Sequence, residues 1–270
     1  MKLVPATVIS NTNLWGEFKR PHARTKLSSW VTWLRCPEIA KEAKPGQFVM
    51  VCCGEECILP RPFSIHQLNE KGDIALFFAV LENGKGTQWL SQRQKGDSVK
   101  LFGPLGNGFS VHPTSRNLLL VAGGWGIAPL FFLAQEAIRK AYSVTLLYGT
   151  ADDKRYPERL MLSGIELVAT TEDGTVGHRG MVTAFLPDFI DRADQVFACG
   201  PMPMYRDMAT KYPQLASKPV QVSLEVVMGC GRGVCYGCTL KTKSGLKQVC
   251  KDGPVFELKD ILWNELAYDC

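Results

Sequence analysis

The sequence predicts three units in chain order: a six-stranded antiparallel β-barrel, an α/β domain with a parallel sheet, and a small cysteine-rich C-terminal domain. Three observations support this prediction. Short strands separated by turn residues fill the first hundred residues, and unbroken apolar strands alternate with helices in the middle of the chain. Four of the ten cysteines then fall between residues 230 and 250. We place the domain boundaries at 1–112, 113–215 and 216–270.

Length and composition exclude several classes of protein. A chain of 270 residues suits two domains with a small appendage, and 46% hydrophobic with 21% charged residues excludes general disorder. The net charge of +5 is scattered, which argues against a nucleic-acid binder. No apolar run reaches the roughly 18 residues of a membrane span. Pro5 interrupts a short apolar N-terminus, so we expect no signal peptide and a cytoplasmic location, where clustered cysteines indicate a metal site.

The barrel is predicted from six segments rich in Val, Ile, Phe, Trp and Thr, with Gly, Pro, Asn and Asp between them. The turn residues of Gly103–Gly108 end this region. The expected strands are Leu3–Ser10, Ser28–Leu34, Gly46–Cys52, Pro60–His66, Asp73–Leu81 and Ser98–Phe102.

The α/β domain begins with the continuous apolar strand Asn117–Ala122, a glycine loop, and a helix over Pro129–Lys140 with Pro129 in its first turn. Apolar strands without alternation indicate a parallel sheet that is covered on both faces. Three more such strands are Ser143–Tyr148, Ile165–Thr170 and Gln195–Cys199.

Cys230, Cys235, Cys238 and Cys250 form the strongest motif, with four, two and eleven residues between successive cysteines. This spacing is typical of a plant-type [2Fe–2S] site. Half of the residues between the first three cysteines are glycine, which lets the loop wrap closely with its N–H groups inward. The alternatives are a structural zinc site, which usually pairs its ligands in two close couples, and free cysteines.

The remaining cysteines and the histidines show no such pattern. Cys52, Cys53 and Cys57 lie close together without a fourth ligand, and we expect Cys52 to be a small buried residue at a strand end. Cys36 and Cys270 receive no role. All four histidines are expected to be structural: His22, His66, His112 and His178.

Two glycine-containing segments lie where a parallel sheet binds ligands. Gly123, Gly124 and Gly126 join a strand to a helix, which brings backbone N–H groups to a phosphate, although they do not form a regular G-x-G-x-x-G. Cys199 ends a buried strand in a Cys-Gly-Pro turn, at the carboxyl edge of the sheet. The simpler interpretation of Cys199 is a buried thiol in a capping turn.

Two barrel segments carry a family resemblance. Arg61-Pro62-Phe63-Ser64 lies on a predicted strand, and Gly84-Lys85-Gly86-Thr87 follows at a glycine turn. Each alone suits an ordinary strand or hairpin turn. At this spacing ahead of an α/β domain, they resemble the ferredoxin–NADP reductase superfamily. The resemblance implies that Arg61 meets the phosphate of a flavin and that Ser64 lies near its ring. It also implies that Gly86 and Thr87 meet the pyrophosphate.

The same resemblance extends to the strand before the turn and to the α/β domain. Ala79, Val80 and Leu81 would pass alongside the flavin, although the superfamily has a Tyr followed by Arg or Lys near positions 80–81. The glycine loop and Cys199 would meet the nicotinamide nucleotide, with Cys199 as the candidate catalytic residue.

Acidic residues after the second strand bear on the choice of nucleotide. Asp152 and Asp153 favour NAD(H) over NADP, while Lys154 and Arg155 weaken that preference. Thr171–Gly174 follows the third strand and either lines the nucleotide site or forms an Asp-Gly turn, which is the simpler interpretation.

Nearly the whole chain resembles the electron-transfer subunits of dihydroorotate dehydrogenase B, most specifically over Met228–Cys238 and Val249–Phe256. The resemblance implies FAD, a [2Fe–2S] cluster and NAD(H) in this chain. It also implies an FMN-containing catalytic subunit of pyrimidine (UMP) biosynthesis, with two copies of each subunit and no nucleic acid or membrane partner. Alternatives are the small subunit of an NADH-dependent ferredoxin:NADP oxidoreductase or sulfide dehydrogenase, where an Asp replaces one cysteine, and a stand-alone flavin reductase.

Overall fold

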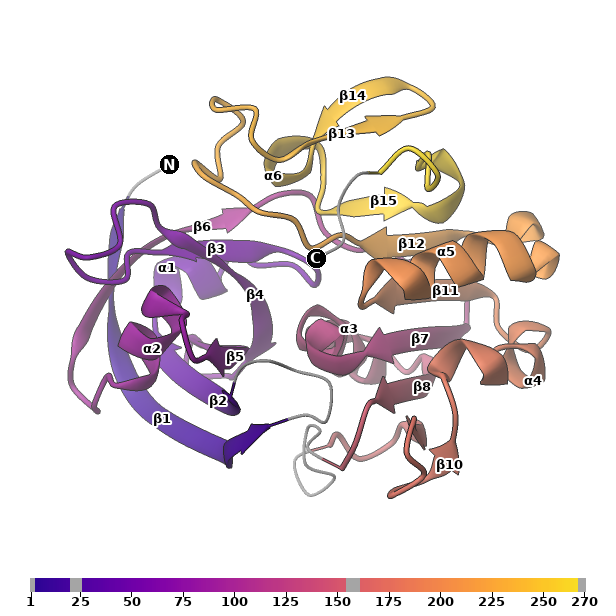
Figure 1. The fold of residues 1–270 in the computed structure, drawn as a ribbon, viewed down its shortest axis with the longest axis horizontal. Helices are drawn as coiled ribbons and strands as arrows, with labels where there is room; N and C mark the ends of the chain where they lie inside the picture. Colours follow the sequence, from indigo (N-terminus) through magenta and orange to yellow (C-terminus); the bar gives the residue numbers. More distant parts are fainter. Residues whose placement is uncertain (1–2, 20–25, 154–160, 267–270) are drawn as a thin grey trace.

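The computed structural model describes residues 3–19, 26–153 and 161–266, and it consists of a barrel, a sheet beside it and a short hairpin above both (Figure 1). The predictions for Lys154, Arg155, His22 and Cys270 lie outside the described residues. Among the described helices, none has the length and apolar composition needed to cross a membrane.

The first unit is a closed six-stranded antiparallel barrel in the order β1-β2-β5-β4-β3-β6, as predicted. Its inward side chains, such as Phe63, Ile65 and Leu76, are buried in one core. Two short helices, α1 (Pro37–Ala40) and α2 (Lys85–Ser91), occupy connections between strands. The strands are β1 (Val4–Lys19), β2 (Lys26–Arg35), β3 (Phe48–Val51), β4 (Arg61–Leu68), β5 (Asp73–Leu81) and β6 (Ser98–Leu105).

The second unit is a seven-stranded sheet in the order β10-β9-β8-β7-β11-β12-β15, in which only β15 runs antiparallel to its neighbour. The bounds are β7 (Asn117–Gly123), β8 (Ser143–Thr150), β9 (Glu166–Thr171), β10 (His178–Arg179), β11 (Gln195–Cys199), β12 (Val220–Ser223) and β15 (Val255–Glu257).

Both faces of this sheet are covered, as the unbroken apolar strands predict. On β7, Leu118 and Leu120 pack with helix α3 (Ile127–Arg139), while Leu119 and Val121 pack on the other face. That second face is covered by the helices α4 (Pro187–Ile190) and α5 (Met202–Lys211).

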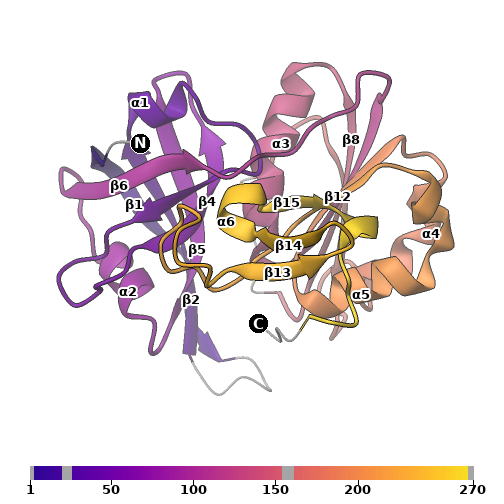
Figure 2. The same cartoon turned by 90° about the horizontal axis from the view of Figure 1, so that it is seen from above.

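The sheet continues past the boundary drawn at residue 215. β12 and β15 lie in the segment 216–270, yet they extend the sheet at its edge. These strands have four and three residues, too few for a clear sequence pattern. The rest of the segment holds the hairpin β13 (Thr239–Thr242) and β14 (Gly245–Gln248), followed by α6 (Val249–Asp252). Figure 2 shows this hairpin and α6 over the junction between barrel and sheet.

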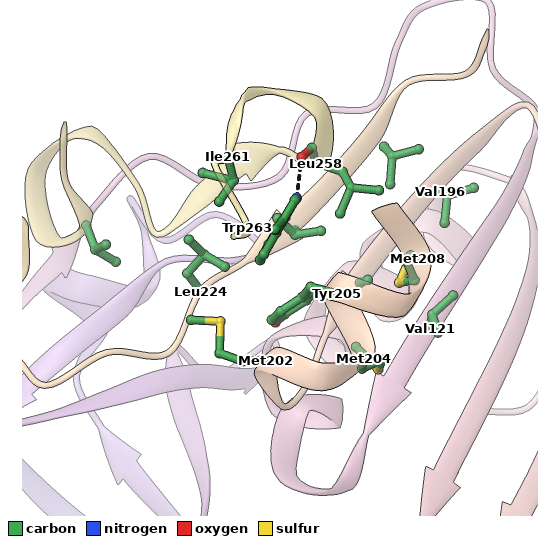
Figure 3. Close-up of a cluster of buried hydrophobic side chains, with 14 of the residues drawn as sticks. Val121, Val196, Met202, Met204, Tyr205, Met208, Leu224, Leu258, Ile261 and Trp263 are labelled. Atoms are coloured by element: carbon green, nitrogen blue, oxygen red, sulfur yellow. Dashed lines mark hydrogen bonds between the residues drawn. The ribbon is translucent and has the colours of Figure 1, made fainter. Parts of the chain in front are cut away.

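Aromatic packing holds the C-terminal segment against the sheet (Figure 3). The Tyr205 ring on α5 stacks on Trp263 at a centroid distance of 5.4 Å, and Trp263 Nε1 donates to the Leu258 carbonyl at 2.9 Å. The same buried cluster contains Met50 of the barrel and Cys250 of the cysteine motif. One of the buried clusters therefore contains side chains from all three units.

Asn107, in the loop after β6, fastens the segment that follows Cys250. Its Nδ2 donates to the carbonyls of Val255 (2.7 Å) and Asp252 (3.1 Å), and its Oδ1 accepts from the Val255 N–H at 3.0 Å. Gly106 beside it approaches Pro254 so closely that a Cβ there would lie 2.5 Å from Pro254 Cδ. The Asp-Gly-Pro-Val sequence at residues 252–255 thus joins the cysteine-rich segment to the loop after β6.

We expect Asn107→Ala to lower the free energy of unfolding by about 2–3 kcal/mol, since three hydrogen bonds of about 0.5–1.5 kcal/mol each are lost. Denaturant unfolding of the apoprotein measures this change. Asn264→Ala is the matched control, because Asn264 is exposed. Equal midpoints for the two variants would contradict the role given to Asn107.

Candidate cofactor junction and cysteine centre

The two barrel segments with a predicted flavin role are in direct contact. Arg61 begins β4, and a Cβ added to Gly86 in α2 would lie 2.7 Å from Arg61 Cγ. Only a residue without a side chain therefore lets the Arg61 stem cross α2 at this point. The Arg61 Nη1 donates to the Leu59 carbonyl at 2.7 Å, and Thr87 Oγ1 donates to the Gly84 carbonyl at 3.0 Å. The arginine and the glycine turn thus form one surface.

The neighbouring strands β4 and β5 divide their side chains between the barrel core and its outside. Phe63 is buried and meets Phe78 edge-on at 5.2 Å. Pro62 and Ser64 alternate with it and are half-buried. Ala79 and Val80 are half-buried as well, and Leu81 at the end of β5 is exposed. The outer positions of these strands are therefore partly open.

The predicted nucleotide loop meets the barrel beside Ala79. Trp125, in the 3-10 turn Gly124–Gly126, donates its Nε1–H to Ser29 Oγ at 3.3 Å. Ser29 stands opposite Ala79 in the β2–β5 ladder. Sequence reasoning missed Trp125, and its only signal was a large aromatic residue between two glycines.

The glycine loop and the Cys-Gly-Pro turn pack backbone against backbone. Ala122 on β7 stands opposite Cys199 on β11. A Cβ on Gly126 would lie 2.1 Å from the Cys199 carbonyl oxygen, and one on Gly123 would lie 2.7 Å from Pro201 Cδ. The structure thus brings together the two segments that the sequence analysis assigned to a nicotinamide nucleotide. Within the glycine loop, Gly124 has a φ of +56°.

Cys199 is fully buried at this edge, with its Sγ 3.9 Å from Glu225 Oε1. Burial and the neighbouring Glu225 raise the pKa of the Cys199 thiol, so the thiol stays protonated. A protonated thiol is a poor nucleophile. Glu225 was missed by sequence reasoning, although an acid two residues after β12 lies at the ligand-binding edge of the sheet.

Tyr205 joins the loops around Cys199. Its hydroxyl donates to the Ser223 carbonyl at 2.7 Å and accepts from the Gly200 N–H at 2.8 Å. These bonds hold the end of β11 against the end of β12.

His66 joins the barrel to the α/β domain. It is fully buried on β4, with its Nδ1 3.1 Å from the Ala128 carbonyl in the first turn of α3. Its ring lies 4.6 Å from that of Phe131. Burial lowers the pKa of His66 to about 4, although the bond to Ala128 acts in the opposite direction. His66 therefore has the structural position that the sequence analysis expected.

The backbone N–H groups of the cysteine loop point at its sulfurs. Gly233 N donates to Cys250 Sγ at 3.1 Å, Arg232 N to Cys230 Sγ at 3.3 Å, and Cys250 N to Cys238 Sγ at 3.4 Å. Gly231 and Gly233 have φ angles of +65° and +77°, in the left-handed region that suits glycine. The glycines thus let the loop turn its donors inward.

The four thiols form two neighbouring pairs, Cys230 with Cys235 and Cys238 with Cys250. Burial opposes ionisation of Cys230, but N–H groups of the loop outweigh it and lower its pKa to about 6. Burial and the Cys238 thiol raise the pKa of Cys250 to about 12. No three His, Cys, Asp or Glu side chains of the described residues converge as ligands of a single ion. Two thiol pairs with inward N–H donors fit a [2Fe–2S] cluster.

The cysteine loop packs on the barrel beside β4. A Cβ on Gly231 would lie 2.6 Å from Met50 Cγ, and the Arg232 guanidinium lies 4.5 Å from the centroid of the Phe102 ring. Met50 on β3 stands opposite Pro62 on β4. The cysteine loop therefore contacts the strand next to the one that carries Ser64.

The structure also tests the predictions for Cys52 and for the segment after β9. The structure buries Cys53 rather than Cys52, which is half-buried, because β3 ends at Val51 and the Cys53 thiol donates to the Val51 carbonyl at 3.4 Å. The segment after β9 forms the Asp-Gly turn, with Asp173 Oδ1 accepting from the Thr175 N–H at 2.9 Å and Gly174 at a φ of +78°.

Solved structures of other proteins share this architecture. A structure titled as an NADH-dependent reduced ferredoxin-NADP oxidoreductase in flavin-based electron bifurcation matches with a TM-score of 0.78 at 27% identity, over 97% of this chain and 91% of that one. The ferredoxin NADP⁺ reductase of Neisseria gonorrhoeae, solved with FAD and NADP, shares the fold at a TM-score of 0.60 and 17% identity, over 80% of this chain and 92% of that one. The class is thus that of the ferredoxin reductase-like oxidoreductases.

Family models and curated relatives define the class further. Residues 32–109 match the oxidoreductase FAD-binding domain, and residues 225–262 match the iron–sulfur cluster binding domain of dihydroorotate dehydrogenase B. The electron transfer subunit of dihydroorotate dehydrogenase B (NAD⁺) from Desulforamulus reducens is 38% identical over 84% of this chain and 90% of its own length. The electron transfer subunit from Caldanaerobacter subterraneus subsp. tengcongensis is 37% identical over 92% of this chain and 99% of its own length. The chain belongs to this family of electron transfer subunits.

His66 predicts a pH dependence of stability. In the unfolded chain His66 has its ordinary pKa of 6.5, whereas in the folded protein its pKa is about 4. Stability from this group is complete above pH 6.5 and falls as the pH drops toward 4, by up to about 1.4 kcal/mol per pH unit. Denaturant midpoints across this range measure the slope.

We expect His66→Asn to flatten that slope, because no titrating group then remains at the buried position. His178→Asn, at an exposed histidine on β10, should keep the wild-type slope. Parallel slopes in all three proteins would show that another group causes the acid sensitivity.

Proposed function

We propose that this chain carries electrons between NAD(H) and a catalytic dihydroorotate dehydrogenase subunit, through FAD and a [2Fe–2S] cluster. One observation supports this order above all: the nucleotide loop and the cysteine loop both pack on the barrel beside β4 and β5. Trp125 reaches Ser29 on one side, and Gly231 rests on Met50 on the other. A flavin on the outer positions of β4 and β5 would thus lie between the two loops.

The residues for FAD lie on one continuous surface. Arg61 would meet a phosphate, and Gly86 and Thr87 would accommodate the pyrophosphate, since the Arg61 stem crosses α2 at Gly86. Ser64 would face the flavin ring. The remaining proposed contacts are Pro62, Ala79 and Leu81, with the backbone of Phe63 and Val80, whose side chains pack in or against the barrel core. Since Leu81 is aliphatic, its side chain would offer packing rather than hydrogen bonds.

The residues for NAD(H) lie at the carboxyl edge of the sheet. Gly123, Gly124 and Gly126 would let the nucleotide approach the backbone, and Cys199 with Glu225 would adjoin the nicotinamide ring. Asp152 and Asp153 after β8 favour NAD(H). Cys230, Cys235, Cys238 and Cys250 would hold the [2Fe–2S] cluster. FAD on the barrel would supply the chemistry that splits the electron pair of NADH into single electrons, which is the form that such a cluster accepts.

Exposed apolar side chains surround the cysteine loop. Val234 and Tyr236 flank the exposed Cys235 and are 72% and 69% exposed, and Val227 precedes the loop at 75%. Leu59 lies against Gly229 of the loop, and Ile58 beside it is 95% exposed. Apolar side chains grouped in this way are typical of a protein interface. We propose this apolar rim as the docking face for the catalytic subunit.

The further details of the assembly follow the family. We propose that the partner holds FMN and that two copies of each subunit assemble, in pyrimidine (UMP) biosynthesis in the cytoplasm. A reducing compartment suits four thiols kept as ligands. The structural match to an NADH-dependent ferredoxin-NADP oxidoreductase supports the second candidate function. Four cysteines in the motif and 38% identity to dihydroorotate dehydrogenase subunits favour the first.

Arg61→Ala should weaken FAD binding by about 10- to 150-fold, because a charge-assisted contact to phosphate contributes about 1.5–3 kcal/mol. Arg61→Lys should fall between wild type and alanine, since lysine lacks the planar guanidinium fork. Fluorescence titration of the apoprotein with FAD measures the dissociation constant. Arg139→Ala, at an exposed arginine of α3, is the control, and an affinity loss equal to that of Arg61→Ala would refute the assignment.

Two variants of the cysteine loop separate the electron exit from the docking face. Cys235→Ser should keep partner binding but lose orotate formation, because a ligand of the cluster is lost. Val234→Asp should keep the cluster but lose partner binding, because a charge then interrupts the apolar rim. Both should retain flavin reduction by NADH, measured by stopped-flow bleaching.

Partner binding is measured by co-purification with the dihydroorotate-oxidising subunit. If Cys235→Ser abolished flavin reduction in a folded protein, the proposed order of carriers would be wrong. Orotate formation by this chain alone would overturn the proposed function, as would zinc in place of about two irons and two labile sulfides per chain.

A further inference from the structure

Gln248 carries a buried polar group that the fold leaves unsatisfied. The residue is 8% exposed, and its side-chain Nε2 has no hydrogen-bond partner. In the described part of the chain, only Thr170 Oγ1 shares this condition. A buried donor without an acceptor costs about 1–3 kcal/mol, so such a group requires an explanation.

The amide lies among the cysteines. Gln248 ends β14 two residues before Cys250, and it stands opposite Thr239, which follows Cys238. On the loop side, a Cβ added to Gly233 would lie 3.0 Å from Gln248 Oε1. The N–H of Gly233 is the one that donates to Cys250 Sγ at 3.1 Å. The side-chain amide therefore adjoins the pair formed by Cys238 and Cys250.

Backbone hydrogen bonds explain where Gln248 lies, but they do not provide a partner for its side-chain amide. The backbone N–H of Gln248 donates to Asp252 Oδ2 at 2.7 Å, which holds the end of the hairpin against α6. The neighbouring N–H of Val249 donates to the Cys238 carbonyl at 3.1 Å. Both bonds involve the main chain, so they fix the place of the side chain without using its amide.

We propose that the Gln248 amide donates a hydrogen bond to a sulfur of the [2Fe–2S] cluster and thereby raises its reduction potential. The inference rests on the proposed function, which supplies the cluster. Cluster sulfurs accept hydrogen bonds, and bonds to them tune the potential. The reduced cluster holds one more electron, so a donor stabilises it more than the oxidised cluster. No bond breaks and no proton moves in this step.

The potential of the reconstituted full-length protein, measured by an EPR-monitored redox titration, tests this role. Gln248→Leu removes the donor and keeps an apolar side chain of similar volume. We expect the equilibrium constant for one-electron reduction to fall about tenfold, a shift of about 59 mV to lower potential. Gln248→Met, which is unbranched like glutamine, provides a second variant with the same expected direction.

Two further measurements separate this role from a structural one. Denaturant unfolding of the apoprotein should show Gln248→Leu to be at least as stable as wild type, because an unsatisfied buried donor is replaced by an apolar group. Glutamine labelled with ¹⁵N in the side chain should give a hyperfine coupling to the reduced wild-type cluster that both variants lack. Leu246→Ala, at an exposed position of the same hairpin, should leave the potential unchanged.

The outcomes are distinguishable. Unchanged potentials in both cluster-loaded variants would overturn the inference and leave the proposed function intact. The inference would also be overturned if the wild-type cluster showed no hyperfine coupling to the labelled amide, for example because a buried water accepts the hydrogen bond of Gln248. A wild-type protein that assembles no cluster on its four cysteines would overturn the proposed function, and this inference with it.

Discussion

Close approach to the backbone at glycines is the constraint on which this structure depends. At Gly126, a Cβ would collide with the Cys199 carbonyl, so only glycine lets the nucleotide loop lie on the Cys-Gly-Pro turn. At Gly86 the same holds for the Arg61 stem, and at Gly231 for Met50. Each of the proposed cofactor sites thus contains one such contact. Electron transfer requires short separations between carriers. These glycines let the supporting loops come close to the Cys199 carbonyl and to the side chains of Arg61 and Met50.

A shared buried cluster links these local contacts. Met50 from the barrel, Val121 from the sheet and Cys250 from the cysteine motif belong to the same buried cluster. The Asn107 side chain and the Tyr205–Trp263 stack then hold the C-terminal segment from two directions. Short cysteine-rich segments rarely bury enough apolar surface to fold alone. Here the neighbouring units supply that surface, since Cys238 and Cys250 lie in a buried cluster with side chains of the barrel and the sheet.

Two buried titratable side chains at the junction between the units are uncharged. The Cys199 thiol is buried and stays protonated, and His66 is a neutral link between barrel and helix α3. The ionisation that the fold does favour is at Cys230, where N–H groups of the loop point at the sulfur. Such donors stabilise the negative charge of thiolate ligands and of a cluster. Beside this centre, Val234 and Tyr236 leave apolar surface exposed around Cys235.

The sequence by itself determined the order of the units and most of their elements. Short strands separated by turn residues are sufficient to predict the barrel. The unbroken apolar strand at residues 117–122 is sufficient to predict the parallel sheet, because both patterns are local. The cysteine spacing likewise predicted the metal centre. Only the tertiary structure decided that β12 and β15 extend the sheet past residue 215, since strands of four and three residues are stabilised by their neighbours. It alone brought Trp125 to Ser29, Glu225 to Cys199 and the Gln248 amide to the cysteine loop, because residues far apart in the chain meet there and no local pattern records such contacts.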